Sequence, residues 1–321
     1  MTKLVSIIVP FRDEDERQLE MILSNINNQI GIDFSRIEVV LVSDGGMELD
    51  ESGLNDAFEN LNIRFYYYAE SKGLSMARSV GMDLAVGQYV MFMDPSDQLY
   101  FVGALLEFFN AIKYHGDHQI IGGKYLEQLK FKDEFRYITH ENDDNEAVMG
   151  KWFNVEYLEN LGLDWLEKLS AFEDAYFVRT ACELADDRYS IDSLIYMQLW
   201  SGQMLGQQNN SMLDQWAYAQ RHVLEKIAAY KPQNLIDDLK QYMSDLYLRM
   251  QLFPAQDKAQ FEVQQQKLLK EFENQWTLVK PKLGETVEEI MKQSLLYRGM
   301  GHSGLDSFIE NQEQLLSAAM Y

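Results

Sequence analysis

The sequence contains few of the residues that build disulfide frameworks or cysteine-rich metal sites. Its 321 residues include one cysteine, Cys182, which excludes an internal disulfide and fits a reducing compartment. No run approaches the roughly 20 apolar residues that a membrane span needs, and the chain opens on MTKLVSIIVP without a long apolar signal segment. We therefore expect a cytoplasmic protein with no membrane span.

Positive charge is also scarce. The chain has 28 lysines and arginines against 51 aspartates and glutamates, and its net charge is −23. Residues 213–321 hold 12 of the basic and 15 of the acidic residues, so residues 1–212 hold the other 16 basic and 36 acidic ones and carry about −20. The longest basic cluster, LKFKDEFR at 129–136, is interrupted by acids. A chain of this charge disfavours nucleic acid and anionic membrane surfaces as partners.

The first hundred residues alternate between two hydrophobic periods. Continuous apolar runs such as LVSIIVP are typical of buried parallel strands, whereas Leu19, Ile22, Leu23 and Ile26 recur at the spacing of a helix face. The alternation predicts an α/β fold with an open, mostly parallel sheet flanked by helices. The predicted strands are 4–10, 37–44, 63–69 and 88–94, and the predicted helices lie around 19–26 and at 74–85.

Past Asp97 the pattern predicts a helix at 99–112, a short strand at 118–123 and an acid-rich surface loop at 140–147. From residue 213 the pattern becomes helical throughout, so we divide the chain into residues 1–212 and an all-helical region, 213–321. An apolar stripe in that region is typical of a helix-bundle core, and part of it is a candidate interface for a homo-oligomer. The stripe consists of Leu235, Leu239, Tyr242, Met243, Leu246, Met250 and Phe253.

Three of the predicted strands end in polar residues. The first runs into PFRDED (10–15), the second into SDGG (43–46) and the fourth into DPSD (94–97). Each segment alone is typical of a turn. Because parallel strands place their carboxyl ends at one edge of a sheet, the three together predict a crevice rich in carboxylates, which favours a divalent cation with a phosphorylated ligand. No G-x-G-x-x-G follows the first strand and no P-loop is present, which disfavours a dinucleotide or P-loop site.

Five segments, in order and approximate spacing, carry a family resemblance. Over residues 3–205 the chain resembles the GT-A fold (Rossmann-like) nucleotide-sugar glycosyltransferases of family two, which are inverting enzymes. The resemblance implies that residues 1–212 are the catalytic domain and leaves acceptor binding or oligomerisation to 213–321. The segments are VSIIVPFRDED, IEVVLVSDGG, ESKGLSMARSVGMDLAVGQYVMFMDPSD, GKWFNVEYL and FEDAYF.

The resemblance implies a binding site for a nucleotide-sugar donor, of which a UDP-sugar fits best. Asp44 matches the aspartate that contacts a uracil-type base, and its structural alternative is a turn cap before Gly45. Lys72, Gly73 and Arg78 match the segment that closes over the nucleotide. The alternative for Arg78 is an ion pair with an acidic residue of a helix. The implied donor-binding residues are Pro10, Phe11, Arg12, Asp13, Asp15, Asp44, Lys72, Gly73, Arg78, Met93, Asp94 and Pro95.

The resemblance also implies Mn²⁺ or Mg²⁺ at the end of the fourth strand. Asp94 matches the first carboxylate of the family's Asp-x-Asp signature, Pro95 fills the variable position, and Ser96 stands where the second aspartate is usual. Because Mg²⁺ and Mn²⁺ keep several waters and need only one or two carboxylates, we expect a weaker metal site completed by Ser96 and Asp97.

Glu173 and Asp174 match the family's acidic pair near the acceptor, and Asp174 is the candidate catalytic base. Their structural alternative is a helix N-terminus, which favours acids. The implied activity is transfer of a hexosyl-type sugar to a hydroxyl of a glycan, a glycoprotein or a lipid-linked acceptor. The missing second aspartate motivates an alternative, a catalytically impaired glycosyltransferase-like protein that binds or scaffolds. Modified DNA as acceptor is disfavoured by the charge of residues 1–212.

Overall fold

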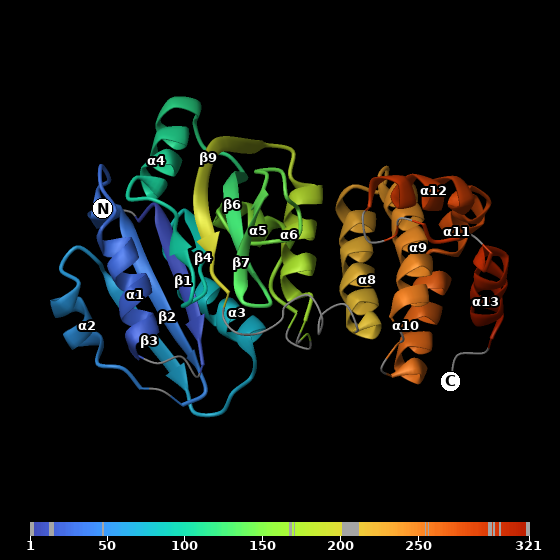
Figure 1. The fold of residues 1–321 in the computed structure, drawn as a ribbon, viewed down its shortest axis with the longest axis horizontal. Coiled ribbons are helices and arrows are strands. Elements are labelled where there is room, and N and C mark those ends of the chain that lie inside the picture. Colours follow the sequence, from blue (N-terminus) through green and yellow to red (C-terminus); the bar gives the residue numbers. More distant parts are fainter. Residues whose placement is uncertain are drawn as a thin grey trace. The chain divides into compact units, whose positions relative to one another are not determined.

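The computed structural model describes residues 3–12, 16–46, 48–166, 169, 171–200, 212–253, 255, 257–294, 297, 299–301 and 303–318. The chain divides into two compact units, Met1–Gln203 and Met204–Tyr321 (Figure 1). The division falls within 201–211, outside the described residues.

One mixed sheet organises the first unit. In the described part of the chain the strand order is β3-β2-β1-β4-β8-β6-β9-β5, with β7 paired to β6. The strands are β1 Val5–Phe11, β2 Ile37–Asp44, β3 Ile63–Tyr68, β4 Tyr89–Phe92, β5 Gln98–Leu99, β6 Ile120–Phe131, β7 Glu134–His140, β8 Lys151–Asn154 and β9 Arg188–Gln198.

The strands β3, β2, β1 and β4 are parallel, as the sequence predicts. Every residue of β1 and β2 is buried, which explains their continuous apolar runs. On the other side of β4 the sheet is mixed: β6 and β9 are parallel, whereas β8 runs antiparallel to both β4 and β6 and β7 forms an antiparallel hairpin with β6. Antiparallel neighbours need only a short connection, such as the turn between Phe131 and Glu134.

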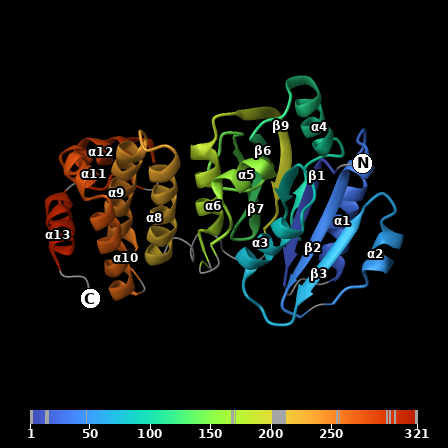
Figure 2. The ribbon, with the colours of Figure 1, turned by 180° about the vertical axis from the view of Figure 1, so that it is seen from behind.

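Besides the 3-10 helix η1 Phe34–Arg36, six α-helices are described in this unit. They are α1 Glu16–Asn27, α2 Glu51–Ala57, α3 Leu74–Leu84, α4 Ala104–His115, α5 Val155–Leu161 and α6 Glu173–Leu184. The helix predicted at 99–112 begins only at Ala104, because Leu99 pairs with Tyr196 of β9 as part of β5. Helix α4 lies beside β9 (Figures 1 and 2), and α3 packs against β1 and β2. Trp152 fills the core by stacking on Phe108 at 4.6 Å between ring centroids.

The described residues of the second unit contain helices and no strand. The helices are α8 Leu213–Tyr230, α9 Leu235–Leu252, α10 Lys258–Glu271, α11 Glu273–Val279, α12 Leu283–Gln293 and α13 Leu305–Ser317. The predicted apolar stripe lies on α9, where its first five residues are buried and Tyr242 stacks on Trp216 at 5.4 Å. Met250, at the far end, is 41% exposed. The stripe therefore serves mainly as the core of the helical unit.

None of the described helices combines the length and the apolarity that a membrane crossing requires.

Candidate functional site

The carboxyl ends of β1, β2 and β4 lie together at one edge of the sheet. Phe11 pairs with Ser43, next to Asp44, and the main-chain N–H of Met93 donates to the carbonyl of Ile8 at 3.0 Å. The predicted crevice edge is therefore present. Asp13 and Asp15, expected on the first of these ends, lie outside the described residues.

The centre of this edge is a buried arginine between three carboxylates. Nη2 of Arg78 donates to Oδ1 of Asp94 at 3.2 Å. Its Nη1 lies 3.2 Å from Oδ1 of Asp174 and 3.6 Å from Oε1 of Glu173. The structure thus joins the end of β4 to the first turn of α6. Arg78 pairs with helix acids, and its contact with a nucleotide stays a prediction.

Trp165 holds the arginine in place. The Cζ atom of Arg78 lies 4.7 Å from the Trp165 ring centroid, and Trp165 stacks on Phe177 at 4.5 Å. Such cation–π contacts strengthen when water is excluded, and the Arg78 side chain is 4% exposed. The sequence motifs did not single out Trp165, which follows the GKWFNVEYL segment with no spacing that relates it to Arg78.

The electrostatics of the cluster set the protonation of Asp174. Burial raises the pKa of Asp174 to about 7, the positive charge of Arg78 opposes this rise, and Glu173 and Asp94 add to it. For Arg78, burial disfavours the charged form, but Asp174, Asp94 and Glu173 outweigh burial and raise its pKa. A carboxyl with a pKa near neutrality is suited to act as a general base.

The two acids of α6 follow a residue with a strained backbone. Phe172, immediately before the helix, has φ 64° in the left-handed region, which is rare for a residue with a side chain. Glu173 and Asp174 then occupy the first turn, where the helix dipole stabilises negative charge. The dipole alternative thus describes their position, but it does not explain why both also face Arg78.

Asp97 is committed to the turn after β4. Its Oδ2 accepts a hydrogen bond from the Tyr196 hydroxyl at 2.8 Å, and its Oδ1 accepts one from the main chain of Leu199 at 3.0 Å. The side chain is 4% exposed, and burial together with the charge of Asp94 raises its pKa well above the usual range. Tyr196 also accepts a 3.4 Å hydrogen bond from the Asp94 main-chain N–H. Tyr196, which the sequence did not indicate, therefore ties β9 to this turn.

The turn after β4 can supply only a small part of the ligands that a divalent cation needs. Among the described residues no group of three or more histidine, cysteine, aspartate or glutamate side chains can hold a metal. Asp94 is 36% exposed and no described residue donates to its Oδ2, so it can offer one carboxylate oxygen. Asp97 is 4% exposed and each of its oxygens accepts a protein hydrogen bond, so its part in the metal site stays a prediction. The donor set fits Mg²⁺ or Mn²⁺ bound mainly by diphosphate oxygens and water.

Asp44 fastens the segment that precedes α3. The carboxylate is fully buried, Oδ1 accepts from the main chain of Lys72 at 2.6 Å and of Gly73 at 3.0 Å, and Oδ2 accepts from the Ser71 hydroxyl at 2.8 Å. Burial raises the pKa of Asp44, but these hydrogen bonds outweigh burial and lower it. A Cβ on Gly45 would lie 2.7 Å from the main-chain nitrogen of Ser71. Only glycine therefore allows this approach, and contact of Asp44 with a base stays a prediction.

The other predicted donor-binding residues differ in exposure. Pro10, Phe11, Met93 and Pro95 are buried, whereas Arg12 is exposed. Lys72 is also exposed, and its Nζ lies 5.5 Å from the Tyr68 ring centroid. Phe11 stacks on Phe65 at 6.3 Å.

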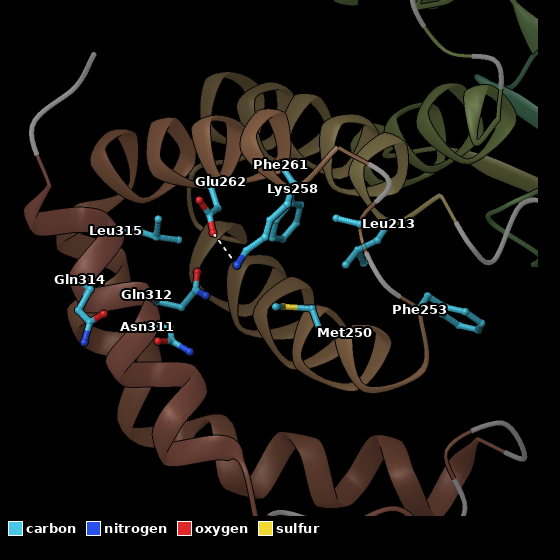
Figure 3. Close-up of a pocket in the computed structure, with 11 residues that line it drawn as sticks. Leu213, Met250, Phe253, Lys258, Phe261, Glu262, Asn311, Gln312, Gln314 and Leu315 are labelled. Atoms are coloured by element: carbon cyan, nitrogen blue, oxygen red, sulfur yellow. Dashed lines mark ion pairs between the residues drawn. The ribbon is translucent and has the colours of Figure 1, made fainter.

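Each of the two units contains a cavity. One of about 420 Å³ lies between α1 and the turn that contains Ser96 and Asp97. The other, of about 480 Å³, lies within the helical unit and is lined by Met250, Phe261 and Asn311 among others (Figure 3). Its two charged side chains, Lys258 and Glu262, pair with each other at 3.6 Å. The second cavity therefore offers mainly apolar and amide groups and no reactive side chain.

A Rossmann-like sheet with acids at its carboxyl edge, and the acidic start of α6 facing them, is the arrangement expected of the GT-A class. The family model for glycosyl transferase family 2 matches residues 6–172, just over half of the chain. The chain therefore belongs to this family.

Several curated relatives match parts of the chain. Glycosyltransferase GlyG of Streptococcus pneumoniae is 24% identical over 175 residues, which is 54% of each chain. The minor teichoic acid biosynthesis protein GgaB of Bacillus subtilis is 32% identical over 93 residues, 29% of this chain and 10% of GgaB. The chain spans at most about half the length of the curated relatives that it matches.

A solved structure matches both units. The crystal structure of S. aureus TarS 1-349 in complex with UDP-GlcNAc has a TM-score of 0.66 and 16% identity, and the match covers 98% of this chain and 90% of that one. The GT-A fold and the all-helical C-terminal region predicted from the sequence are confirmed.

Proposed function

We propose that the chain is an inverting glycosyltransferase that moves a sugar from a UDP-sugar to a hydroxyl of a carbohydrate-bearing acceptor. The observation that carries this proposal is that the Arg78 guanidinium contacts both Asp94 and Asp174. Asp94 is the carboxylate proposed to lie near the diphosphate, and Asp174 is the candidate base.

The proposed reaction is a single displacement. Asp174 accepts the proton of the acceptor hydroxyl while the hydroxyl oxygen bonds to the anomeric carbon of the donor sugar. The bond from that carbon to the diphosphate breaks on the opposite face, which inverts the configuration, and UDP leaves with the bonding electrons. The pKa of about 7 for Asp174 supports this role. Near neutral pH a large fraction of such a carboxylate is ionised, and it is more basic than an ordinary aspartate.

Donor binding is proposed for the edge formed by Asp44, Lys72, Gly73 and the turn after β4. The likeness of the fold to TarS, whose structure contains UDP-GlcNAc, supports a uridine diphosphate sugar as the donor. A divalent cation held by Asp94, with Ser96 close by, would offset the negative charge of the departing diphosphate.

The acceptor is proposed to be a glycan, a glycoprotein or a lipid-linked saccharide. The name of GgaB, a relative over the catalytic unit, concerns the biosynthesis of a teichoic acid and supports a glycopolymer among these. For the helical unit, acceptor binding and oligomerisation stay the two proposed roles.

Release of UDP tests the proposal. The purified chain with Mn²⁺ is incubated with UDP-glucose, UDP-galactose, UDP-GlcNAc and UDP-GalNAc, with GDP-mannose as the control donor. We expect UDP release from at least one UDP-sugar, dependent on the cation and lost in Asp174→Asn. Binding of UDP without release from any donor would instead support the non-catalytic binding or scaffold protein.

A further inference from the structure

The β6–β7 hairpin extends past the crevice edge of the sheet. Ile120 of β6 pairs with Phe153 of β8, which in turn pairs with Val90 of β4. Because β8 is antiparallel to both neighbours, β6 runs in the same direction as β4. Strand β4 ends at Phe92, whereas β6 continues to residue 131. The outer half of the hairpin therefore stands beyond the edge where Asp94 lies.

Strand pairing sorts the side chains of the hairpin onto two faces. Lys130 is opposite Phe135 and Gln128 is opposite Tyr137, so these four share one face. The alternate residues, which include Phe131 opposite Glu134, point to the other face. Phe135 is 50% exposed and Tyr137 is 51% exposed. Large aromatic side chains gathered at such exposure are typical of a binding surface.

Trp200, which follows β9, completes the first face. Nζ of Lys130 lies 4.7 Å from the Trp200 ring centroid, and the rings of Trp200 and Phe135 are 6.4 Å apart. Three aromatic rings and one ammonium group therefore lie on one side of the hairpin. We call this surface the hairpin platform, and it consists of Lys130, Phe135, Tyr137 and Trp200.

The platform is fastened to the turn of the candidate site. The side-chain amide of Gln128 accepts from the main chain of Trp200 at 3.3 Å and donates to the Tyr137 hydroxyl at 3.0 Å. The residue before Trp200, Leu199, donates to the Asp97 carboxylate at 3.0 Å. Short contacts thus connect the aromatic surface to the 94–97 turn, and a chain lying on the platform is held next to the crevice.

We propose that the hairpin platform binds sugar rings of the acceptor chain away from the hydroxyl that reacts, and so favours polymeric acceptors. The inference rests on the proposed function. Sugar rings present apolar C–H faces that pack on aromatic side chains and hydroxyls that accept hydrogen bonds from an ammonium group. A membrane surface is disfavoured by the charge of about −20 on residues 1–212. A second copy of the chain along β7, which pairs only with β6 among the described strands, is the remaining rival.

Affinity electrophoresis of the full chain tests the platform without knowledge of the natural acceptor. Native gels contain dextran, pullulan, hyaluronan or alginate, which separates neutral from anionic glycans. We expect retardation in at least one of the four. The double variant Lys130→Ala/Phe135→Ala should weaken the apparent dissociation constant by roughly tenfold, the size of one or two lost aromatic contacts.

Phe131→Ala is the matched control, because Phe131 is also 50% exposed but lies on the opposite face. It should be retarded as strongly as the wild type. Absence of retardation in all four gels, or equal retardation of both variants, would overturn the platform. So would binding to phosphatidylglycerol vesicles alone, or a dimer in light scattering that the double variant abolishes.

Release of UDP from the donor, measured on the same proteins, keeps the two proposals separate. Platform-dependent retardation without UDP release leaves a glycan-binding hairpin and overturns only the proposed function. UDP release without platform-dependent retardation overturns only the platform.

Discussion

Nη1 of Arg78 lies 3.2 Å from Oδ1 of Asp174, and only 4% of the arginine side chain is exposed. The same guanidinium reaches Asp94 through Nη2, also at 3.2 Å. One buried cation therefore contacts both the proposed base and the proposed metal ligand. A change in the charge of either carboxylate is felt by the other through this arginine, and the predictions for the site depend on that connection.

Asp174→Asn should lower kcat by about 10²–10⁴-fold, because an amide cannot accept the proton that a positioned general base removes. The dissociation constant for UDP should change little, because Asp174 is not proposed to contact the nucleotide. Turnover is measured by UDP release and UDP binding by calorimetry. Glu156→Gln is the control, since Glu156 is an exposed acid in the first turn of α5. Full turnover in Asp174→Asn would exclude it as the base.

The pH dependence of turnover should follow the ionisation of Asp174. Burial raises the pKa of Asp174 to about 7, so the carboxyl is protonated, and inactive as a base, below that pH. We expect kcat/KM for the acceptor to rise by about tenfold per unit up to pH 7 and then to level off. A rising limb with its midpoint near pH 4 would contradict this assignment.

The sequence could predict the parts of the fold that local periodicity determines. The buried runs of β1 and β2 are unambiguous, whereas the sequence does not predict β7, because EFRYITH alternates only over its first four residues and is exposed on both faces. In the site, strand ends located Asp94 and Asp44 correctly at the crevice edge. Trp165 and Tyr196 could not be found in this way, because they reach Arg78 and Asp94 through tertiary packing between distant segments.

Binding of the cation should depend on Asp94 far more than on Ser96. Asp94→Asn should weaken Mn²⁺ binding in the presence of UDP by at least about tenfold, because it removes the available carboxylate. Ser96→Ala should change it by less than about threefold, since a water can replace a hydroxyl. Calorimetric titration of Mn²⁺ into the UDP complex compares the two variants. Equal losses would show that Ser96 takes the place of the missing aspartate.

Tyr196→Phe should destabilise the catalytic unit by about 1–3 kcal/mol, because it leaves the buried Asp97 carboxylate without one of its donors. Urea denaturation measures the change. Tyr137→Phe, which removes a hydroxyl from a residue that is 51% exposed, should cost less than about 0.5 kcal/mol. Equal stabilities of the two variants would mean that Asp97 does not depend on Tyr196.

Arg78→Gln should move the rising limb of the pH profile to higher pH. The positive charge of Arg78 lowers the pKa of Asp174 against the effect of burial, so its removal lets burial, Glu173 and Asp94 raise that pKa further. A neighbouring opposite charge typically shifts a carboxyl pKa by 1 to 3 units, so a displacement of roughly one unit or more is expected. Arg78→Lys keeps the positive charge and should leave the midpoint near pH 7. Its rate should be lower, because an ammonium group cannot reach Asp94 and Asp174 together as the guanidinium does. Circular dichroism shows whether each variant is folded. An unchanged midpoint in folded Arg78→Gln would mean that the arginine positions Asp174 without controlling its ionisation.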